Sequence, residues 1–255
     1  MATPPHPTLS PDGGEGILLD VRGVTKRFGG IVANNDISFQ VGAGELVGVI
    51  GPNGAGKSTL FDVLTGFQTA DAGEVLLDGR AVSRLRPDQI SRLGVARTFQ
   101  KLKPFTQMTV VENVMVGAFQ KTTVPARARR EAMEALDRVG LADKAEAHAR
   151  VLSTGQRKRL ELARALATQP RLLLLDEVTG GVDQRSIPAL VDLVRRLHGE
   201  GASLIVIEHN MSVIMGISQR IVALNLGEVI ADGPPAVVGR DPRVVEAYLG
   251  QAYVA

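Results

Sequence analysis

A run of nine residues early in the chain constrains its fold more than any other feature. The run comprises Gly51, Pro52, Asn53, Gly54, Ala55, Gly56, Lys57, Ser58 and Thr59, and it follows the apolar stretch Leu46–Ile50. This order predicts a strand, a glycine-rich turn and the start of a helix. In such a turn, successive backbone N–H groups can surround a phosphate, and the helix N-terminus beside it carries roughly half a positive charge. The nine residues are therefore predicted to bind a nucleotide polyphosphate.

Two side chains in this loop predict how the nucleotide is held. Lys57 can reach the β- and γ-phosphates as a point charge, and the Ser58 hydroxyl can ligate the Mg²⁺ ion that bridges them. The alternative is a glycine-rich turn with a chance lysine. That alternative leaves the preceding strand and the filled fixed positions of the motif unexplained, so ATP and Mg²⁺ are the expected ligands.

Composition restricts the remaining possibilities. The 255 residues are 44% hydrophobic and 22% charged, which fits one large domain or one domain with an insertion. A net charge of +2 does not require a nucleic acid partner, and the absence of cysteine excludes disulfides and thiolate metal sites. No apolar run is long enough to span a bilayer. Residues 1–16, rich in Pro and Gly, lack the features of a signal peptide and are predicted to form a flexible tail.

The segments around the loop predict an antiparallel sheet. Residues 17–24 and 36–41 roughly alternate between apolar and polar side chains, as half-buried strands do. Between them, Phe28 precedes the pair Gly29-Gly30 in an expected turn. The Phe28 ring is predicted either to stack on a nucleotide base or to fill the core.

A helical insertion is predicted from about residue 110 to residue 168. Ala128, Ala132 and Leu136 recur at helical spacing, and Gly140 closes that helix. Further on, Ser153 is placed to cap the helix that carries Leu160, Leu162 and Leu166. Its N-terminus is a second potential anion site.

Two later apolar runs predict buried parallel strands with chemical groups at their carboxyl ends. Leu172–Leu175 is followed by Asp176 and Glu177, and residues 203–208 are followed by His209. Open α/β sheets bind ligands at this end of their strands. Asp176 can orient Mg²⁺, Glu177 can take a proton from an attacking water, and His209 lies beside the expected phosphates. The alternative is a strand that simply ends in exposed acids.

Taken together and in order, these motifs resemble the ATP-binding cassette ATPases of membrane transporters. The order is the phosphate loop, Gln100, Leu152–Gln156, Leu172–Glu177, Gly181–Asp183 and His209. The resemblance covers the chain from about residue 18 to its end. It implies an α/β fold with a P-loop NTPase core, a mixed sheet, an N-terminal antiparallel β subdomain and an α-helical subdomain inserted at about residues 101–169, all within one ATPase domain of residues 17–255.

The resemblance also implies roles for individual residues. Phe28 would stack on adenine, Gln100 would ligate Mg²⁺, Glu177 would polarise the hydrolytic water and His209 would contact the γ-phosphate. Ser153, Thr154, Gly155 and Gln156 would act in trans on ATP bound to a second cassette, and Asp183 would lie at that dimer interface. When the second cassette closes over the bound ATP, these residues would add hydrogen-bond donors to the γ-phosphate and exclude solvent from it.

Two positions depart from the family pattern. Thr154 stands where the signature usually has glycine, and it adds bulk where a phosphate must approach. Val178 stands where proline commonly follows the catalytic glutamate. Both acidic residues of that motif are intact, so hydrolysis is still expected.

Within the family, Gly94–Gln100, Ile207–Met211, Met215–Ser218 and Ala247–Gly250 resemble the branched-chain amino acid importer ATPases. Urea importers and the ATPase of lipopolysaccharide export are less similar. The resemblance implies a cytoplasmic-face subunit that pairs with a second cassette, identical or different, and sits under two permeases fed by a periplasmic binding protein. The surface from about Lys101 to Val116 would receive the permeases' helices.

Two other classes of protein are weighed against this one. A non-transport cassette that acts on ribosomes or DNA ends would need two cassettes in one chain or a very long coiled-coil insertion. A phosphotransferase that shares only the phosphate loop would leave Leu152–Gln156 and His209 unexplained.

Overall fold

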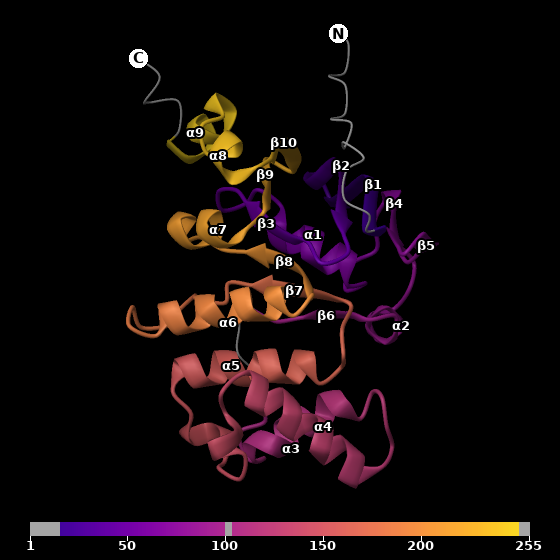
Figure 1. Cartoon of the computed structure of the whole chain (residues 1–255). Helices are drawn as coiled ribbons and strands as arrows, with labels where there is room; N and C mark the ends of the chain where they lie inside the picture. Colours follow the sequence, from indigo (N-terminus) through magenta and orange to yellow (C-terminus); the bar gives the residue numbers. More distant parts are fainter. Residues whose placement is uncertain (1–15, 100–103, 250–255) are drawn as a thin grey trace.

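The architecture consists of two β-sheets with a helix between them and a layer of helices on the outer face of the larger sheet. The computed structural model describes residues 16–99 and 104–249. The helices of the predicted insertion lie together at the bottom of Figure 1, and helix α9, Pro242–Leu249, lies at the top. The predicted tail, residues 1–16, falls outside the described residues except for Gly16.

The larger sheet has six strands in the order β10-β9-β3-β8-β7-β6. Their bounds are β3 Leu46–Ile50, β6 Val95–Arg97, β7 Leu172–Asp176, β8 Ser203–Ile207, β9 Arg220–Asn225 and β10 Glu228–Gly233. The strands from β9 to β6 run parallel, and β10 pairs antiparallel with β9, which makes the sheet mixed. Every residue of β3, β7 and β8 is buried, as the apolar runs predicted.

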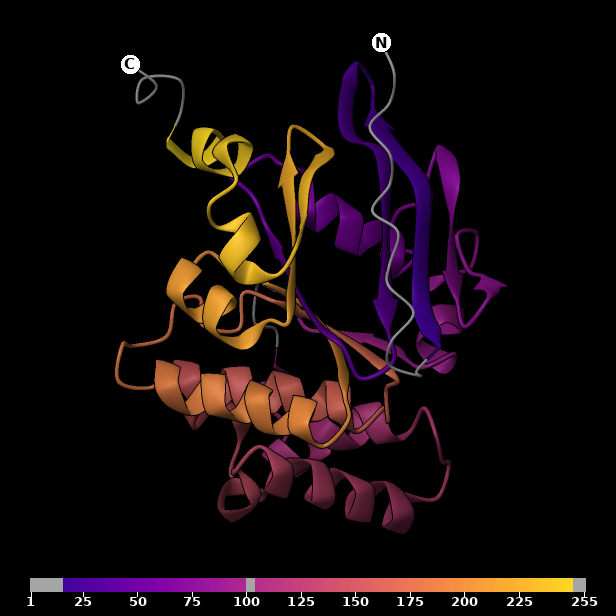
Figure 2. The same cartoon turned by 45° about the horizontal axis from the view of Figure 1, so that its top comes forward.

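The smaller sheet is antiparallel, in the order β2-β1-β4-β5. Its strands are β1 Ile17–Phe28, β2 Ile31–Gly42, β4 Ala72–Leu77 and β5 Arg80–Ala81. Helix α1, Lys57–Leu64, lies between the two sheets (Figures 1 and 2). Its Leu60 and Phe61 join a core cluster with side chains of both sheets, which holds the helix between them.

The side chains of β7 alternate between two cores. Leu172 and Leu174 face the core around α1, whereas Leu173 and Leu175 face the core that contains the other large helices. This alternation places α1 and α5 on opposite faces of the central sheet.

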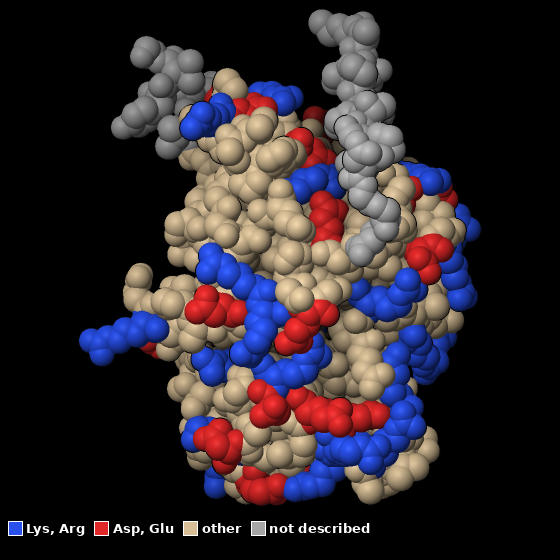
Figure 3. All heavy atoms as spheres, in the orientation of Figure 1, with Lys and Arg blue, Asp and Glu red and all other residues tan. Residues whose placement is uncertain are grey.

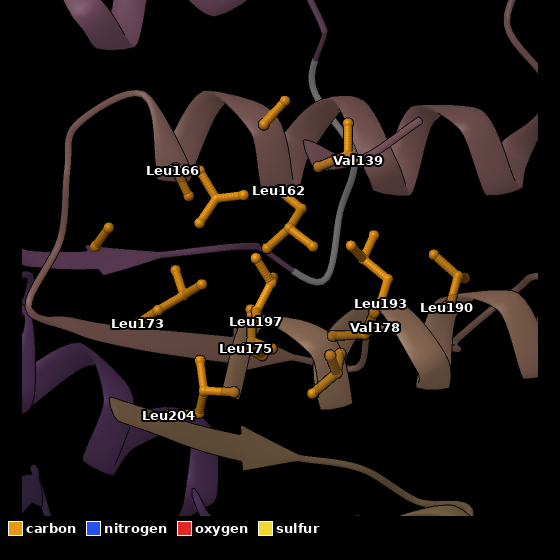
Figure 4. Packing of buried hydrophobic residues seen from close by; sticks show 14 of the residues in the cluster. Val139, Leu162, Leu166, Leu173, Leu175, Val178, Leu190, Leu193, Leu197 and Leu204 are labelled. Atoms are coloured by element: carbon orange, nitrogen blue, oxygen red, sulfur yellow. The ribbon is translucent and has the colours of Figure 1, made fainter. Parts of the chain in front are cut away.

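The outer layer is built from helices packed on that second core. These elements are α3 Val110–Ala118, α4 Pro125–Arg138, η1 Ala142–Lys144, η2 Ala149–Val151, α5 Thr154–Leu166 and α6 Ile187–Gly199. In Figure 4, Leu193 and Leu197 of α6 lie between β7 and the face of α5 that carries Leu162. On the face drawn in Figure 3, charges of both signs interleave over these helices. Arg138 of α4 forms an ion pair with Glu200, the C-cap of α6.

Three short helices were not predicted, namely α2 Pro87–Arg92, α7 Met211–Ile217 and α8 Pro235–Val238. The closing helix α9, Pro242–Leu249, is predicted by the pair Asp241-Pro242, which is typical of a helix start. Helix α2 escaped prediction because its N-cap is Arg86, an unusual capping residue, whose backbone N–H is satisfied by Gln89. Among the helices in residues 16–99 and 104–249, none has the length and apolar character needed to cross a bilayer.

We predict that Leu197→Ala lowers the free energy of unfolding by about 2–5 kcal/mol, because it leaves a cavity between α6, α5 and the sheet. Leu197 is fully buried, whereas Val237 on α8 is 64% exposed. Val237→Ala is the control and should change that free energy by less than about 0.5 kcal/mol. Denaturant titration of both variants measures the difference; equal effects would contradict the packing described.

Candidate functional site

The loop between β3 and α1 has the backbone shape that a phosphate site requires. Gly51, Gly54 and Gly56 all have positive φ angles, at 153°, 82° and 96°. A Cβ atom on Gly56 would lie 2.2 Å from the Ala33 carbonyl oxygen, so only glycine fits there. Gly56 is also the N-cap of α1 and supplies no side-chain cap, which leaves first-turn N–H groups for an anion.

Lys57 is buried and folds back across this loop. Its Nζ donates to the carbonyl oxygens of Gly51 at 2.6 Å and Pro52 at 3.0 Å. Burial lowers the pKa of the ammonium, and the carboxylates of Glu177 and Asp176 oppose that shift. A polyphosphate in the loop would offer Lys57 charged acceptors in place of neutral carbonyls.

The two predicted metal ligands in the described part of the chain lie near one another. Ser58 and Asp176 line the same cavity, which has a volume of about 770 Å³. Arg97, to which the sequence gave no role, donates from Nη2 to Asp176 Oδ2 at 3.0 Å and from Nη1 to Asp62 Oδ1 at 2.5 Å. Burial raises the pKa of Asp176, and the hydrogen bond from Arg97 opposes that change. Gln100, the third predicted ligand, lies outside the described residues.

Glu177 and His209 are joined at the carboxyl ends of β7 and β8. The Nε2 atom of His209 lies 2.9 Å from Glu177 Oε1. Glu177 has a φ of 51°, in the left-handed region that non-glycine residues seldom adopt. The carboxylate is largely buried and the imidazole half exposed, so the pair opens toward solvent on the histidine side.

Phe28 presents its ring to the surface. It is the last residue of β1 rather than part of the turn, and it is 45% exposed. The prediction that it fills the core is therefore wrong. The Nζ atom of Lys26 lies 5.3 Å from the ring centroid, so one face of the ring already contacts a cation.

The signature segment begins α5. Ser153 caps the helix as predicted, because its hydroxyl accepts from the Gln156 N–H at 3.3 Å, and Gln156 Oε1 accepts from the Ser153 N–H at 3.0 Å. Thr154 is exposed, whereas Gly155 is buried near Val182 and Ser186. Asp183 accepts from the Ser186 N–H at 3.1 Å and from its hydroxyl at 2.7 Å. Since α5 and α1 pack on opposite faces of the sheet, one chain does not bring this segment onto its own phosphate loop.

Comparison with known proteins agrees with this geometry. A family model described as "ABC transporter" matches residues 34–180, more than half of the chain. The chain belongs to the ABC transporter family. It is an ATP-binding cassette that couples ATP hydrolysis to transport across a membrane.

The relatives of this cassette include proteins of known transport systems. It is 40% identical to the high-affinity branched-chain amino acid transport ATP-binding protein LivG of Salmonella typhimurium, over 92% of this chain and 98% of LivG. Identity and coverage are the same for BraF of Pseudomonas aeruginosa, which has the same descriptive name. A crystal structure of an ABC transporter cassette in its ADP conformation superposes with a TM-score of 0.84 at 30% identity, covering 92% of this chain and all of that one.

One contact in the cassette was missed by sequence reasoning and joins its C-terminal region to the phosphate loop. A family model described as "Branched-chain amino acid ATP-binding cassette transporter" matches residues 228–254, which include Tyr248. The Tyr248 hydroxyl accepts a hydrogen bond from the Gly51 N–H at 2.7 Å. No short-range pattern could reveal a contact between residues 197 positions apart.

We predict that Tyr248→Phe destabilises the cassette by about 1 kcal/mol, because the buried Gly51 N–H loses its acceptor while the ring is kept. The free energy of unfolding, measured by urea titration, tests this. An unchanged free energy would show that the hydroxyl does not hold the loop.

Proposed function

We propose that this cassette is the ATP-hydrolysing subunit of an importer for branched-chain amino acids or closely related amino acids. The observation that carries the hydrolytic part is the Glu177–His209 pair at 2.9 Å, which lies where β7 and β8 end. Strand β8 is the neighbour both of β7 and of β3, the strand that leads into the phosphate loop. The observation that favours the substrate class is 40% identity to LivG along nearly the whole length of both chains.

The residues of the site fit ATP with Mg²⁺. Positive-φ glycines and first-turn N–H groups suit a polyphosphate, and Lys57 supplies a cation next to it. The Ser58 hydroxyl and the Asp176 carboxylate are hard oxygen donors of the kind that Mg²⁺ takes. They would hold the ion together with Gln100, and the ion would neutralise charge on the β- and γ-phosphates. Phe28, with an exposed ring, would stack on the base.

Glu177 would act as the general base. Its carboxylate would accept a proton from the water that attacks the γ-phosphorus, while the bond between that phosphorus and the bridging oxygen breaks. His209, hydrogen-bonded to Glu177, would orient the carboxylate and contact the γ-phosphate. Lys57 and the loop N–H groups would stabilise charge on the departing diphosphate.

The second half of each ATP site would come from another cassette subunit, identical or different. Ser153, Thr154, Gly155 and Gln156 are on the face of the sheet opposite α1, so a facing subunit would have to bring its own copy to this loop. Asp183 would lie at that interface. ATP would hold the two cassettes together, and hydrolysis would release them.

The cavity beside the metal ligands is the proposed contact with two permease subunits. Its lining combines exposed apolar groups, among them Phe67, Phe99 and Val116, with Ser58 and Asp176 at the nucleotide. A permease helix seated there would contact the catalytic end of the sheet directly. In this proposal the cassette would lie at the cytoplasmic face of the inner membrane, with a periplasmic binding protein acting on the other side and no role for nucleic acid.

Replacing Glu177 with Gln should lower kcat for ATP hydrolysis by about 100- to 10,000-fold and leave ATP affinity unchanged, because only proton abstraction is lost. Steady-state phosphate release and fluorescent-nucleotide titration measure the two quantities. Glu134→Gln, an exposed position on α4, is the matched control and should hydrolyse at the wild-type rate. Unchanged hydrolysis in Glu177→Gln would exclude Glu177 as the base.

Replacing Lys57 with Ala should weaken ATP binding by roughly 10- to 100-fold, since hydrogen bonds to charged groups contribute about 1.5–3 kcal/mol. The partly exposed Lys144 provides the control Lys144→Ala, which removes the same charge away from the loop. Wild-type affinity in Lys57→Ala, measured by equilibrium titration, would contradict the phosphate-loop assignment.

Purification of the tagged chain from native membranes in mild detergent should recover two permeases and a second cassette, identified by mass spectrometry. Val116→Glu places a charge in the apolar lining of the cavity and should lose the permeases. Val237→Glu, on exposed α8 and outside the cavity, should keep them. Equal recovery by both variants would exclude the cavity as the permease contact.

A further inference from the structure

Helix α5 contains a buried lysine to which the proposed mechanism gives no role. Lys158 lies one turn after Gly155 of the signature segment and is only 6% exposed. Its Nζ donates to the backbone carbonyl oxygen of Glu177 at 2.6 Å. A buried ammonium is costly unless it is hydrogen-bonded, so this contact offsets part of the cost of burying the charge.

The Glu177 carbonyl meets Lys158 because the backbone of Glu177 is left-handed. A φ of 51° costs a non-glycine residue about 1 kcal/mol or more. The Gly180 N–H donates to the same carbonyl at 3.1 Å. A Cβ atom on residue 180 would lie 3.2 Å from Glu177 Oε2, which leaves little room for any other residue. The turn that aims the carboxylate is therefore held at its carbonyl by Lys158 and Gly180.

The other side of this turn is held by the two residues that follow β8. The buried carboxylate of Glu208 accepts from the Thr179 N–H at 2.7 Å and from the Thr179 hydroxyl at 2.8 Å. The next residue, His209, contacts the Glu177 side chain. Glu208 and His209 thus anchor the turn to the central sheet, whereas Lys158 anchors it to a helix of the outer layer.

We propose that Lys158 is a positioning residue that holds Glu177 in its productive geometry and links it to the signature helix of the same chain. The inference rests on the proposed role of Glu177 as the base. The N-terminus of α5 would contact ATP of the partner cassette, and Lys158 follows it within one turn. When the signature segment docks on the partner's ATP, the resulting movement of α5 reaches the chain's own Glu177 through Lys158. This contact couples the two ATP sites of the dimer.

The test compares Lys158→Met, which keeps length and burial but removes the donor, with Lys158→Arg, which keeps it. In the full-length chain with Mg-ATP, Lys158→Met should lower kcat by about 10- to 100-fold, the range that a displacement of about 1 Å produces. ATP affinity should stay within about twofold, and Lys158→Arg should regain most of kcat. Lys144→Met is the control for loss of a lysine charge from the outer layer and should retain the wild-type kcat.

A double-mutant cycle with Glu177→Gln shows whether Lys158 acts through Glu177. Single-turnover hydrolysis should be no slower in Lys158→Met/Glu177→Gln than in Glu177→Gln alone. Three results would overturn the inference: a wild-type kcat in Lys158→Met, a full additional loss on the Glu177→Gln background, or a parallel fall in ATP affinity and Tm. If Glu177→Gln itself hydrolyses normally, the proposed function fails; if it is slow while Lys158→Met is normal, only the role of Lys158 fails.

Discussion

The whole nucleotide site depends on the parallel pairing of three buried strands. Val49 of β3 pairs with Ile207 of β8, and Ile207 pairs with Asp176 of β7, so the three strands end at the same level. Gly51 directly follows β3, Glu177 directly follows β7, and His209 follows β8 after one intervening residue. Because the strands are covered on both faces, a slip of their register by one residue would exchange the side chains of two packed cores, and this restriction keeps the reactive groups together.

The charged side chains at the carboxyl ends of these strands form hydrogen bonds within the protein. Lys57 is bonded to its own loop, Asp176 to Arg97, and Glu177 to His209. Each of these contacts satisfies a charged group that burial would otherwise penalise. Binding of ATP with its metal would exchange several of them for contacts with phosphate and metal, so the site is preorganised by bonds that the ligand can replace.

Helix α5 connects the signature segment at its N-terminus with the loop that carries Glu177. Thr154 in its first turn is exposed and Ser153 caps the helix, whereas Lys158 in its second turn is buried against the loop after β7. The same helix packs on α3 and α4. A rigid helix of this kind carries a displacement at one end to the other with little loss, because its backbone hydrogen bonds are internal.

Local patterns in the sequence were sufficient to predict the sheets, the phosphate loop, the cap at Ser153 and the family, because each depends on residues that are close together in the chain. The bounds of the helical insertion stay a prediction. Sequence reasoning placed Phe28 in a turn, whereas it ends β1, and it gave no role to Arg97, Lys158 or Tyr248. Contacts of these three side chains span 79, 19 and 197 residues, and such pairings arise only when the strands and helices pack. The sequence by itself determined which groups meet a phosphate; the tertiary structure alone decided what holds them, because long-range hydrogen bonds depend on packing and not on local spacing.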